Sequence, residues 1–60
     1  MQQGIHVRIV PKRAQGDPHH PSCQNGYVVH IGEYLVQVAV EGQFLAEMCL
    51  PEELVEIEGV

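Results

Sequence analysis

Short runs of alternating apolar and polar residues, each ended by glycine or proline, constrain the fold of this chain most. Residues 5–10, IHVRIV, alternate in this way, and Pro11 ends the run because proline cannot donate a hydrogen bond to a β-ladder. Residues 34–40, YLVQVAV, repeat the pattern. Alternation with a period of two is typical of a β-strand that buries one face. The sequence therefore predicts a mainly β protein.

Three further segments complete a predicted five-stranded protein. Residues 27–31, YVVHI, are rich in β-branched residues, and QFLAEMCL and LVEIE follow at residues 43–50 and 54–58. Gly32–Glu33 and Glu41–Gly42 separate the middle strands. Because glycine adopts positive φ without steric cost, we expect tight hairpins at both places, the first as a type II′ turn.

The alternation also predicts which side chains point toward the core. The residues expected inside are Ile5, Val7, Ile9, Tyr34, Val36, Val38, Val40, Phe44, Ala46, Met48, Leu50, Val55 and Ile57. The apolar residues expected on the outer strand faces are Val10, Val28, Leu35, Leu45 and Cys49. Apolar positions on the outer faces favour a protein interface.

A long loop interrupts the strands early in the chain. Residues 11–26, PKRAQGDPHHPSCQNG, hold most of the turn-forming residues, and loops of this length are usually functional or disordered. Near the other end, Pro51-Glu52-Glu53-Leu54 predicts a single helical turn, because proline fits a first helical position and carboxylates favour an N-terminal turn. A helix over residues 43–57 is the alternative, since several of these residues are good helix formers, but Pro51 in its middle opposes it.

The segment GYVVHIGEYLVQVAVEGQFLAEMCLPEELVEIE, residues 26–58, resembles the second half of an SH3-like small β-barrel. The resemblance implies one all-β domain over residues 1–60: a five-stranded barrel with a long variable loop after the first strand and a one-turn 3-10 helix before the last strand. In such barrels the final strand pairs with the first. The class includes nucleic-acid-binding modules, peptide binders and small accessory subunits, so the fold does not by itself define the function.

Chain length and charge favour a binding role over catalysis. A 60-residue chain buries only about 60% of its unfolded surface, which leaves little room for both a core and a deep catalytic cleft. Residues 1–30 carry a formal charge of +2, whereas residues 31–60 carry seven glutamates and no cation. No run reaches the ~18 apolar residues of a membrane span, and no signal peptide is recognisable. We therefore expect a cytoplasmic protein that does not contact a membrane.

The strongest candidates for a chemical role are His19, His20 and Cys23 in the long loop. His20 and Cys23 have the H-x-x-C spacing of a ligand pair for zinc, although a structural zinc site needs four ligands. The other ligands would come from Cys49, His6 or His30. One pair is a weak signal, and the simpler interpretation is a solvated, turn-forming loop. We expect no metal and no cofactor, and a metal-binding protein that uses His19, His20 and Cys23 is kept as the third functional hypothesis.

The two cysteines are expected to be free thiols, because a reducing compartment disfavours a Cys23–Cys49 bridge. Cys23 could act as a nucleophile with His19 or His20 as its base. A surface loop positions such groups poorly, and no oxyanion site is recognisable. The sequence therefore predicts no catalytic residue and no enzyme.

The leading prediction is a binding module or accessory subunit that acts through contacts with another protein or with its own copies. The residues expected to contact the partner are Arg8, Lys12, Arg13, His19, His20, Glu47, Glu52, Glu53 and Glu56. The alternative is nucleic-acid binding by Arg8, Lys12 and Arg13, which could neutralise about two or three phosphates. The acidic charge and the lack of stacking aromatic residues disfavour it.

Overall fold

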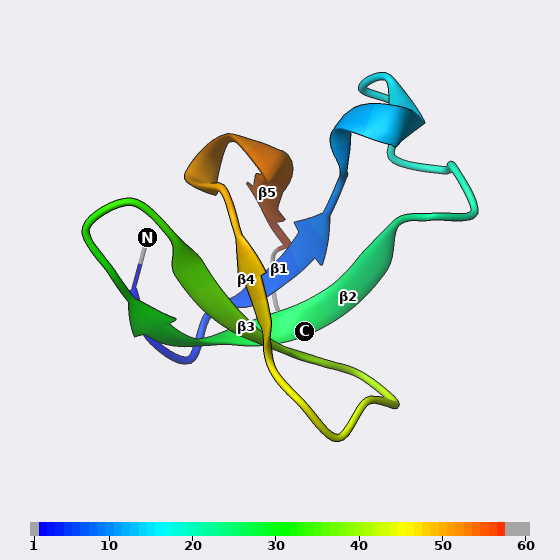
Figure 1. Ribbon diagram of the computed structural model, residues 1–60. Coiled ribbons are helices and arrows are strands. Elements are labelled where there is room, and N and C mark those ends of the chain that lie inside the picture. The colour runs from blue at the N-terminus through cyan, green and yellow to red at the C-terminus, as the bar shows by residue number, and fades with distance from the viewer. Residues whose placement is uncertain (1, 58–60) are drawn as a thin grey trace.

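A computed structural model describes residues 2–57 and confirms the predicted all-β class. The strands are β1 (His6–Ile9), β2 (Gln24–Ile31), β3 (Val36–Val40), β4 (Glu47–Cys49) and β5 (Leu54–Glu56), and single 3-10 turns form η1 (Lys12–Ala14) and η2 (Pro51–Glu53). The long connection after β1 and the one-turn helix before β5 both lie where the sequence predicts them. They place η1 and η2 together at one end of the molecule (Figure 1).

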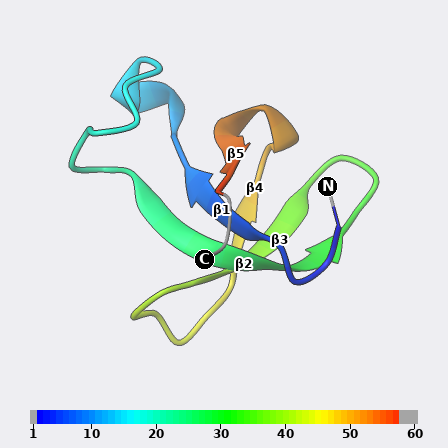
Figure 2. The ribbon, with the colours of Figure 1, turned by 180° about the vertical axis from the view of Figure 1, so that it is seen from behind.

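The five strands form one antiparallel sheet in the order β4-β3-β2-β1-β5. β5 pairs with β1 through a register that sets Val55 opposite Arg8, as the resemblance implies. The sheet is strongly curled into a half-barrel, with β2 running across it as its longest strand (Figures 1 and 2). The architecture is therefore compatible with a small barrel fold.

Two features of β2 accompany the curl. The register with β3 shifts between Val28 and His30, so Val29 is an extra, bulged residue. Gly26 lies close to β3: a Cβ atom there would be 2.5 Å from the carbonyl oxygen of Ala39 and 2.7 Å from Val38 Cγ1. Glycine inside a strand typically marks such a close backbone approach. Only a residue without a side chain fits at position 26.

The core contains small side chains. Its buried cluster comprises Val7, Ile9, Val28, Val36, Val38, Val40 and Cys49, and Ile5 and Leu54 pack against it while partly buried. All three aromatic side chains are exposed to some extent: Tyr27, Tyr34 and Phe44. The interior of the half-barrel is therefore filled mainly by valine, and the three aromatic side chains lie outside it.

The prediction for residues 43–50 is wrong in both its extent and its facing. The strand covers only residues 47–49, and its buried side chain is Cys49, whereas Met48 is exposed. Phe44 lies in the β3–β4 connection and is fully exposed. Both faces of the predicted strand carried apolar residues, so the alternation did not decide which face is buried. Val28 was likewise assigned to the outer face and is buried.

The buried face of the last strand is also opposite to the prediction. Leu54 packs against the core, whereas Val55 is 54% exposed. Tyr34 was expected inside with the valines of β3, but it precedes the strand and is 78% exposed. Of the predicted strand 54–58, residue 58 lies outside the described residues.

The turns differ in detail from the sequence prediction. Gly42 has a φ of 81°, as expected, and Gln43 N donates to Val40 O, which is the geometry of a type II turn with glycine at its third position. Gly32 N donates to Leu35 O, but Gly32 does not have positive φ, so the predicted type II′ turn is wrong. β2 begins at Gln24, and the long loop accordingly ends before it.

The helical alternative for residues 43–57 is wrong. That segment contains β4, η2 and β5, with η2 as its only helical turn. Over the described part of the chain, no helix has the length and apolar character needed to cross a membrane.

Candidate interaction surface

Arg8 on β1 fastens the long loop to the sheet. Its Nε donates to Pro18 O at 2.6 Å, and its Nη1 donates to Asn25 Oδ1 at 2.7 Å. Two of the five N–H donors of the guanidinium group are therefore used within the protein itself. Of the predicted basic patch, Lys12 and Arg13 remain exposed on η1, and neither side chain has a hydrogen-bond or ion-pair partner within residues 2–57.

Successive backbone turns order the loop further. Asp17 N donates to Ala14 O at 3.0 Å, His20 N donates to Asp17 O at 3.2 Å, and Cys23 N donates to His20 O at 3.0 Å. The buried Cys23 thiol also donates to Asp17 O, at 3.3 Å. The segment rich in proline and histidine is thus a compact coil with its own hydrogen bonds.

The candidate metal ligands do not come together. Ser22 N donates to His20 Nδ1 at 3.0 Å, and Ser22 Oγ lies 2.5 Å from the same nitrogen. His19 is exposed, and the Cys23 thiol is turned toward Asp17. Within the residues that the structure describes, no group of three or more His, Cys, Asp or Glu side chains has an arrangement that could hold a metal ion.

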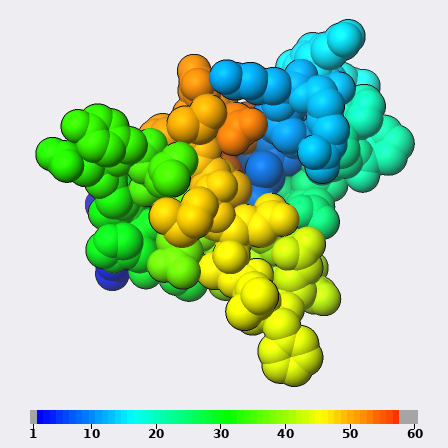
Figure 3. Space-filling view, in the orientation of Figure 1, coloured from blue at the N-terminus to red at the C-terminus, as the bar shows by residue number. Residues whose placement is uncertain are grey.

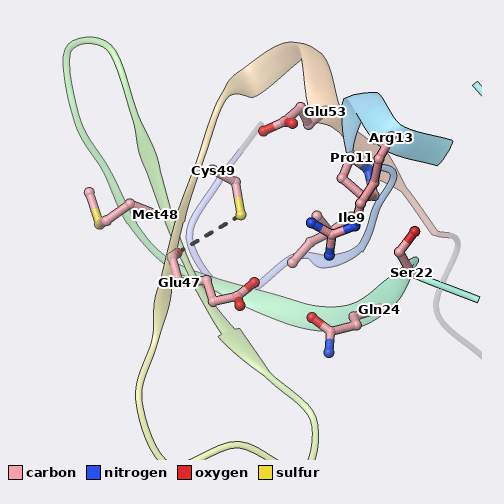
Figure 4. A pocket seen from close by; sticks show the side chains of 9 residues that line it. All are labelled: Ile9, Pro11, Arg13, Ser22, Gln24, Glu47, Met48, Cys49 and Glu53. Carbon is pink, nitrogen blue, oxygen red and sulfur yellow. Dashed lines mark hydrogen bonds between the residues drawn. The ribbon is translucent and has the colours of Figure 1, made fainter. Parts of the chain in front are cut away.

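A hollow of about 290 Å³ opens between β4 and the loop (Figure 4). Its lining residues are Ile9, Pro11, Arg13, Ser22, Gln24, Glu47, Met48, Cys49 and Glu53. The Cys49 sulfur points into the hollow, whereas the Met48 side chain points away from it. Glu53 is held in place because its Oε1 accepts a hydrogen bond from Leu50 N at 3.1 Å.

The surroundings of Cys49 keep its thiol protonated. Burial raises the pKa of Cys49 from 9.0 to about 11, with the negative charges of Glu47 and then Glu53 adding to the effect. Because the thiolate is the reactive form of cysteine, Cys49 should be a poor nucleophile and a poor metal ligand near neutral pH. This argues against Cys49 as a nucleophile in the hollow.

We expect Cys49 to make the protein less stable as the pH rises from about 9 to about 11. In this window the unfolded chain releases the Cys49 proton, whereas the folded chain retains it, so deprotonation favours unfolding. Urea denaturation at several pH values measures the slope. In Cys49→Ala the slope should become shallower, and equal slopes in the two proteins would contradict this assignment.

A second hollow, the apolar groove, lies on the other side of η2. It encloses about 450 Å³ and is lined by Val10, Pro11, Lys12, Gly16, Pro18, Glu52, Glu53 and Val55. Pro11 and Glu53 border both hollows. The structure thus brings together the start of the loop and the acidic η2–β5 segment. Both contain residues that the sequence predicts to contact a partner. His19 and His20 line neither hollow.

The acidic contact residues divide between the two hollows. Glu47 lines the first hollow, Glu52 lines the apolar groove, and Glu53 lines both. Glu56 is exposed on β5 and lines neither.

The sequence interpretation correctly placed Leu45 on an outer face, but it wrongly expected Phe44 and Met48 inside. Phe44 is fully exposed and Leu45 is 81% exposed in the β3–β4 connection, and Met48 is exposed on β4. The connection projects from the body of the molecule (Figure 3). We call residues 42–46 the hairpin tip. The signal that could have revealed it is Gly42, a turn residue only two positions before Phe44.

No protein-family model, curated protein or solved structure matches this chain. The half-barrel is therefore compatible with a small barrel fold but does not assign the chain to a superfamily.

Proposed function

We propose that this protein is a small non-enzymatic binding module or accessory subunit that works through protein–protein contacts. One observation carries the proposal: the buried core cluster consists of valines, one isoleucine and one cysteine, whereas Phe44 and Leu45 on the hairpin tip are exposed to water. Exposed apolar side chains that cluster on a projecting segment are typical of interaction sites.

The energetic argument supports a partner. Burial of one phenylalanine or leucine side chain contributes about 1.5–3 kcal/mol, whereas the core of so small a domain rarely supplies more than about 3–5 kcal/mol. A partner that covers Phe44 and Leu45 would therefore add a stabilisation comparable with that of the fold itself. The SH3-like resemblance agrees with this role, since that class includes small accessory subunits.

The other two candidate functions have less support. For nucleic-acid binding, the Arg8 guanidinium group holds the loop with two of its N–H donors. Arg8, Lys12 and Arg13 together neutralise few phosphates beside seven glutamates in the second half of the chain. Metal binding would require His20 and Cys23 to give up their present hydrogen bonds and bind a metal ion instead. We therefore favour protein contact over both.

Site-specific photo-cross-linking in the native host tests the proposal. A photoreactive phenylalanine analogue at position 44 should form discrete protein adducts, because Phe44 is expected to be covered by a partner. The same analogue at Gln3, which is exposed and polar, is the matched control and should form few. If position 44 gives no more adducts than position 3, the hairpin tip is not a contact site and the proposal is wrong.

A further inference from the structure

Asn25 is the only asparagine of the sequence, and a glycine follows it. In such a pair the backbone nitrogen of the glycine can attack the side-chain amide carbon of the asparagine, because a residue without a Cβ atom hinders the approach least. The N–Cγ bond forms, the Cγ–Nδ2 bond breaks, and the glycine N–H proton leaves with the ammonia. Water then opens the cyclic imide at either of its two carbonyl carbons, which gives aspartate or isoaspartate.

The packing of β2 keeps glycine at position 26. A Cβ atom there would lie 2.5 Å from the carbonyl oxygen of Ala39 and 2.7 Å from Val38 Cγ1. A larger residue, which would slow the attack, therefore does not fit. Protection of Asn25 has to come from the restraints that the fold places on the two reacting atoms.

The peptide unit between Asn25 and Gly26 is held from both sides. On the β3 side, Glu41 N donates to Asn25 O at 2.9 Å. On the β1 side, Val28 N donates to Ile5 O at 3.0 Å, and in an antiparallel ladder every second residue points the same way. Gly26 precedes Val28 by two residues in the same register, so its N–H is also directed at β1. The attacking nitrogen therefore lies within the ladder.

The side chain of Asn25 is held as well. Arg8 lies directly opposite Asn25, and its Nη1 donates to Asn25 Oδ1 at 2.7 Å. The same guanidinium group donates to Pro18 O through Nε, so Arg8 is itself fixed at a second point. The imide ring closes only if the Asn25 backbone rotates and the amide group leaves Arg8.

We propose that Asn25 is a deamidation site that the folded protein protects and that reacts only when β2 separates from its neighbours. β2 is the middle strand of the sheet, so this opening involves most of the domain. For a domain of this size the stability corresponds to a reaction roughly 100- to 1,000-fold slower in the folded chain than in the unfolded chain. This modification is independent of the partner contact proposed above.

The two products differ in whether they can refold. An aspartate at position 25 places a carboxylate opposite Arg8, and a carboxylate accepts hydrogen bonds from a guanidinium group more strongly than an amide does. An isoaspartate adds a methylene group to the main chain, so the residues on one side of it lose their register with β1 and β3. The aspartate product therefore returns to the folded state, whereas the isoaspartate product does not.

Peptide mapping by mass spectrometry tests the protection. The wild type is incubated at one mildly alkaline pH, both in buffer and in unfolding guanidinium chloride. Deamidation at Asn25 should be roughly 100-fold or more faster in the unfolded chain, and a ratio below about tenfold overturns the proposal. The protection of the Gly26 amide from hydrogen exchange should match that ratio within about tenfold, since both reactions need the same opening, and a larger mismatch also overturns it.

Gln15→Asn is the matched control, because it creates a second Asn-Gly pair in an exposed turn of the loop. Position 15 has a φ of 54°, a left-handed conformation that asparagine tolerates well. In this variant position 15 should deamidate at nearly the same rate in the folded and unfolded chains, while Asn25 stays protected. Equal protection at both positions would mean that the sheet is not its source.

Asn25→Asp tests the fate of the products. At neutral pH this variant should fold, with a urea midpoint at or above that of the wild type, because the charged pair with Arg8 replaces a neutral hydrogen bond. After deamidation in guanidinium chloride and refolding, the folded fraction from size exclusion should contain aspartate and no isoaspartate at position 25. A lower midpoint, or isoaspartate in the folded fraction, would contradict the assignment.

Discussion

Gly26→Ala should destabilise the protein by about 3 kcal/mol or more and leave much of it unfolded at room temperature. The added Cβ would lie 2.5 Å from the backbone oxygen of Ala39, which cannot move without separating β2 from β3. Overpacking of this kind typically costs about 1–3 kcal/mol, and more where the obstacle is backbone. The whole domain is worth only about 3–5 kcal/mol. Urea denaturation followed by circular dichroism measures the loss.

Gly42→Ala provides the matched control for this substitution. Gly42 has a positive φ, but no atom lies within 4 Å of the place that an added methyl group would take, so only the cost of about 1–2 kcal/mol for a left-handed residue applies. The two variants therefore separate steric collision from backbone strain. If Gly26→Ala is no more destabilising than Gly42→Ala, the close approach of β2 and β3 is incorrect.

Val38→Ala should have the next largest effect, about 1.5–3 kcal/mol. Val38 has no exposed surface and lies in the middle of the valine cluster, so the substitution removes two methyl groups and leaves a cavity. In a domain this small the loss amounts to roughly half of the total stability. Thermal and urea unfolding should both report it.

Val29→Ala is the corresponding control. Val29 is the bulged residue of β2 and is 45% exposed, so the same substitution should cost less than about 1 kcal/mol. Equal losses at the two positions would mean that the core does not lie where the structure places it.

Much of the architecture was predictable from local signals. The alternation in residues 5–10 gave the correct buried face for β1, because Val7 and Ile9 are apolar and His6 and Arg8 are not. The valines at 36, 38 and 40 are buried for the same reason. Pro51 and the two following glutamates correctly indicated η2, since proline and carboxylates both favour a first helical turn.

The errors arose where the periodicity of apolar residues does not show which side chains are buried. Residues 43–50 have apolar side chains at both even and odd positions, so either face could have been buried, and the choice of Cys49 over Met48 depends on tertiary packing. The bulge at Val29 leaves no mark in the alternation of a strand whose residues are nearly all apolar. Phe44 lies in the connection between β3 and β4, outside the valine core.

The residues of the candidate interaction surface were predictable only in part. Charge and proximity in sequence placed Arg8 with Lys12 and Arg13, but a guanidinium group can equally bind backbone oxygens, and Arg8 binds that of Pro18, ten residues away. Sequence cannot reveal such a partner, because every residue has the same carbonyl group. The groove likewise depends on η1, η2 and β5 meeting in space.

One NOESY spectrum in solution tests the central claim, which is a curled sheet around a core of valines with the aromatic side chains outside. Val10 N donates to Glu53 O and Ile57 N donates to His6 O, which makes Ile9 and Leu54 a non-hydrogen-bonded pair with Cα atoms about 4.5 Å apart. We predict a strong Hα–Hα contact between Ile9 and Leu54 and, at a dilution where the protein is monomeric, none from the Phe44 ring to the methyl groups of Val38. A Phe44–Val38 contact under those conditions, or no Ile9–Leu54 contact, would contradict the account.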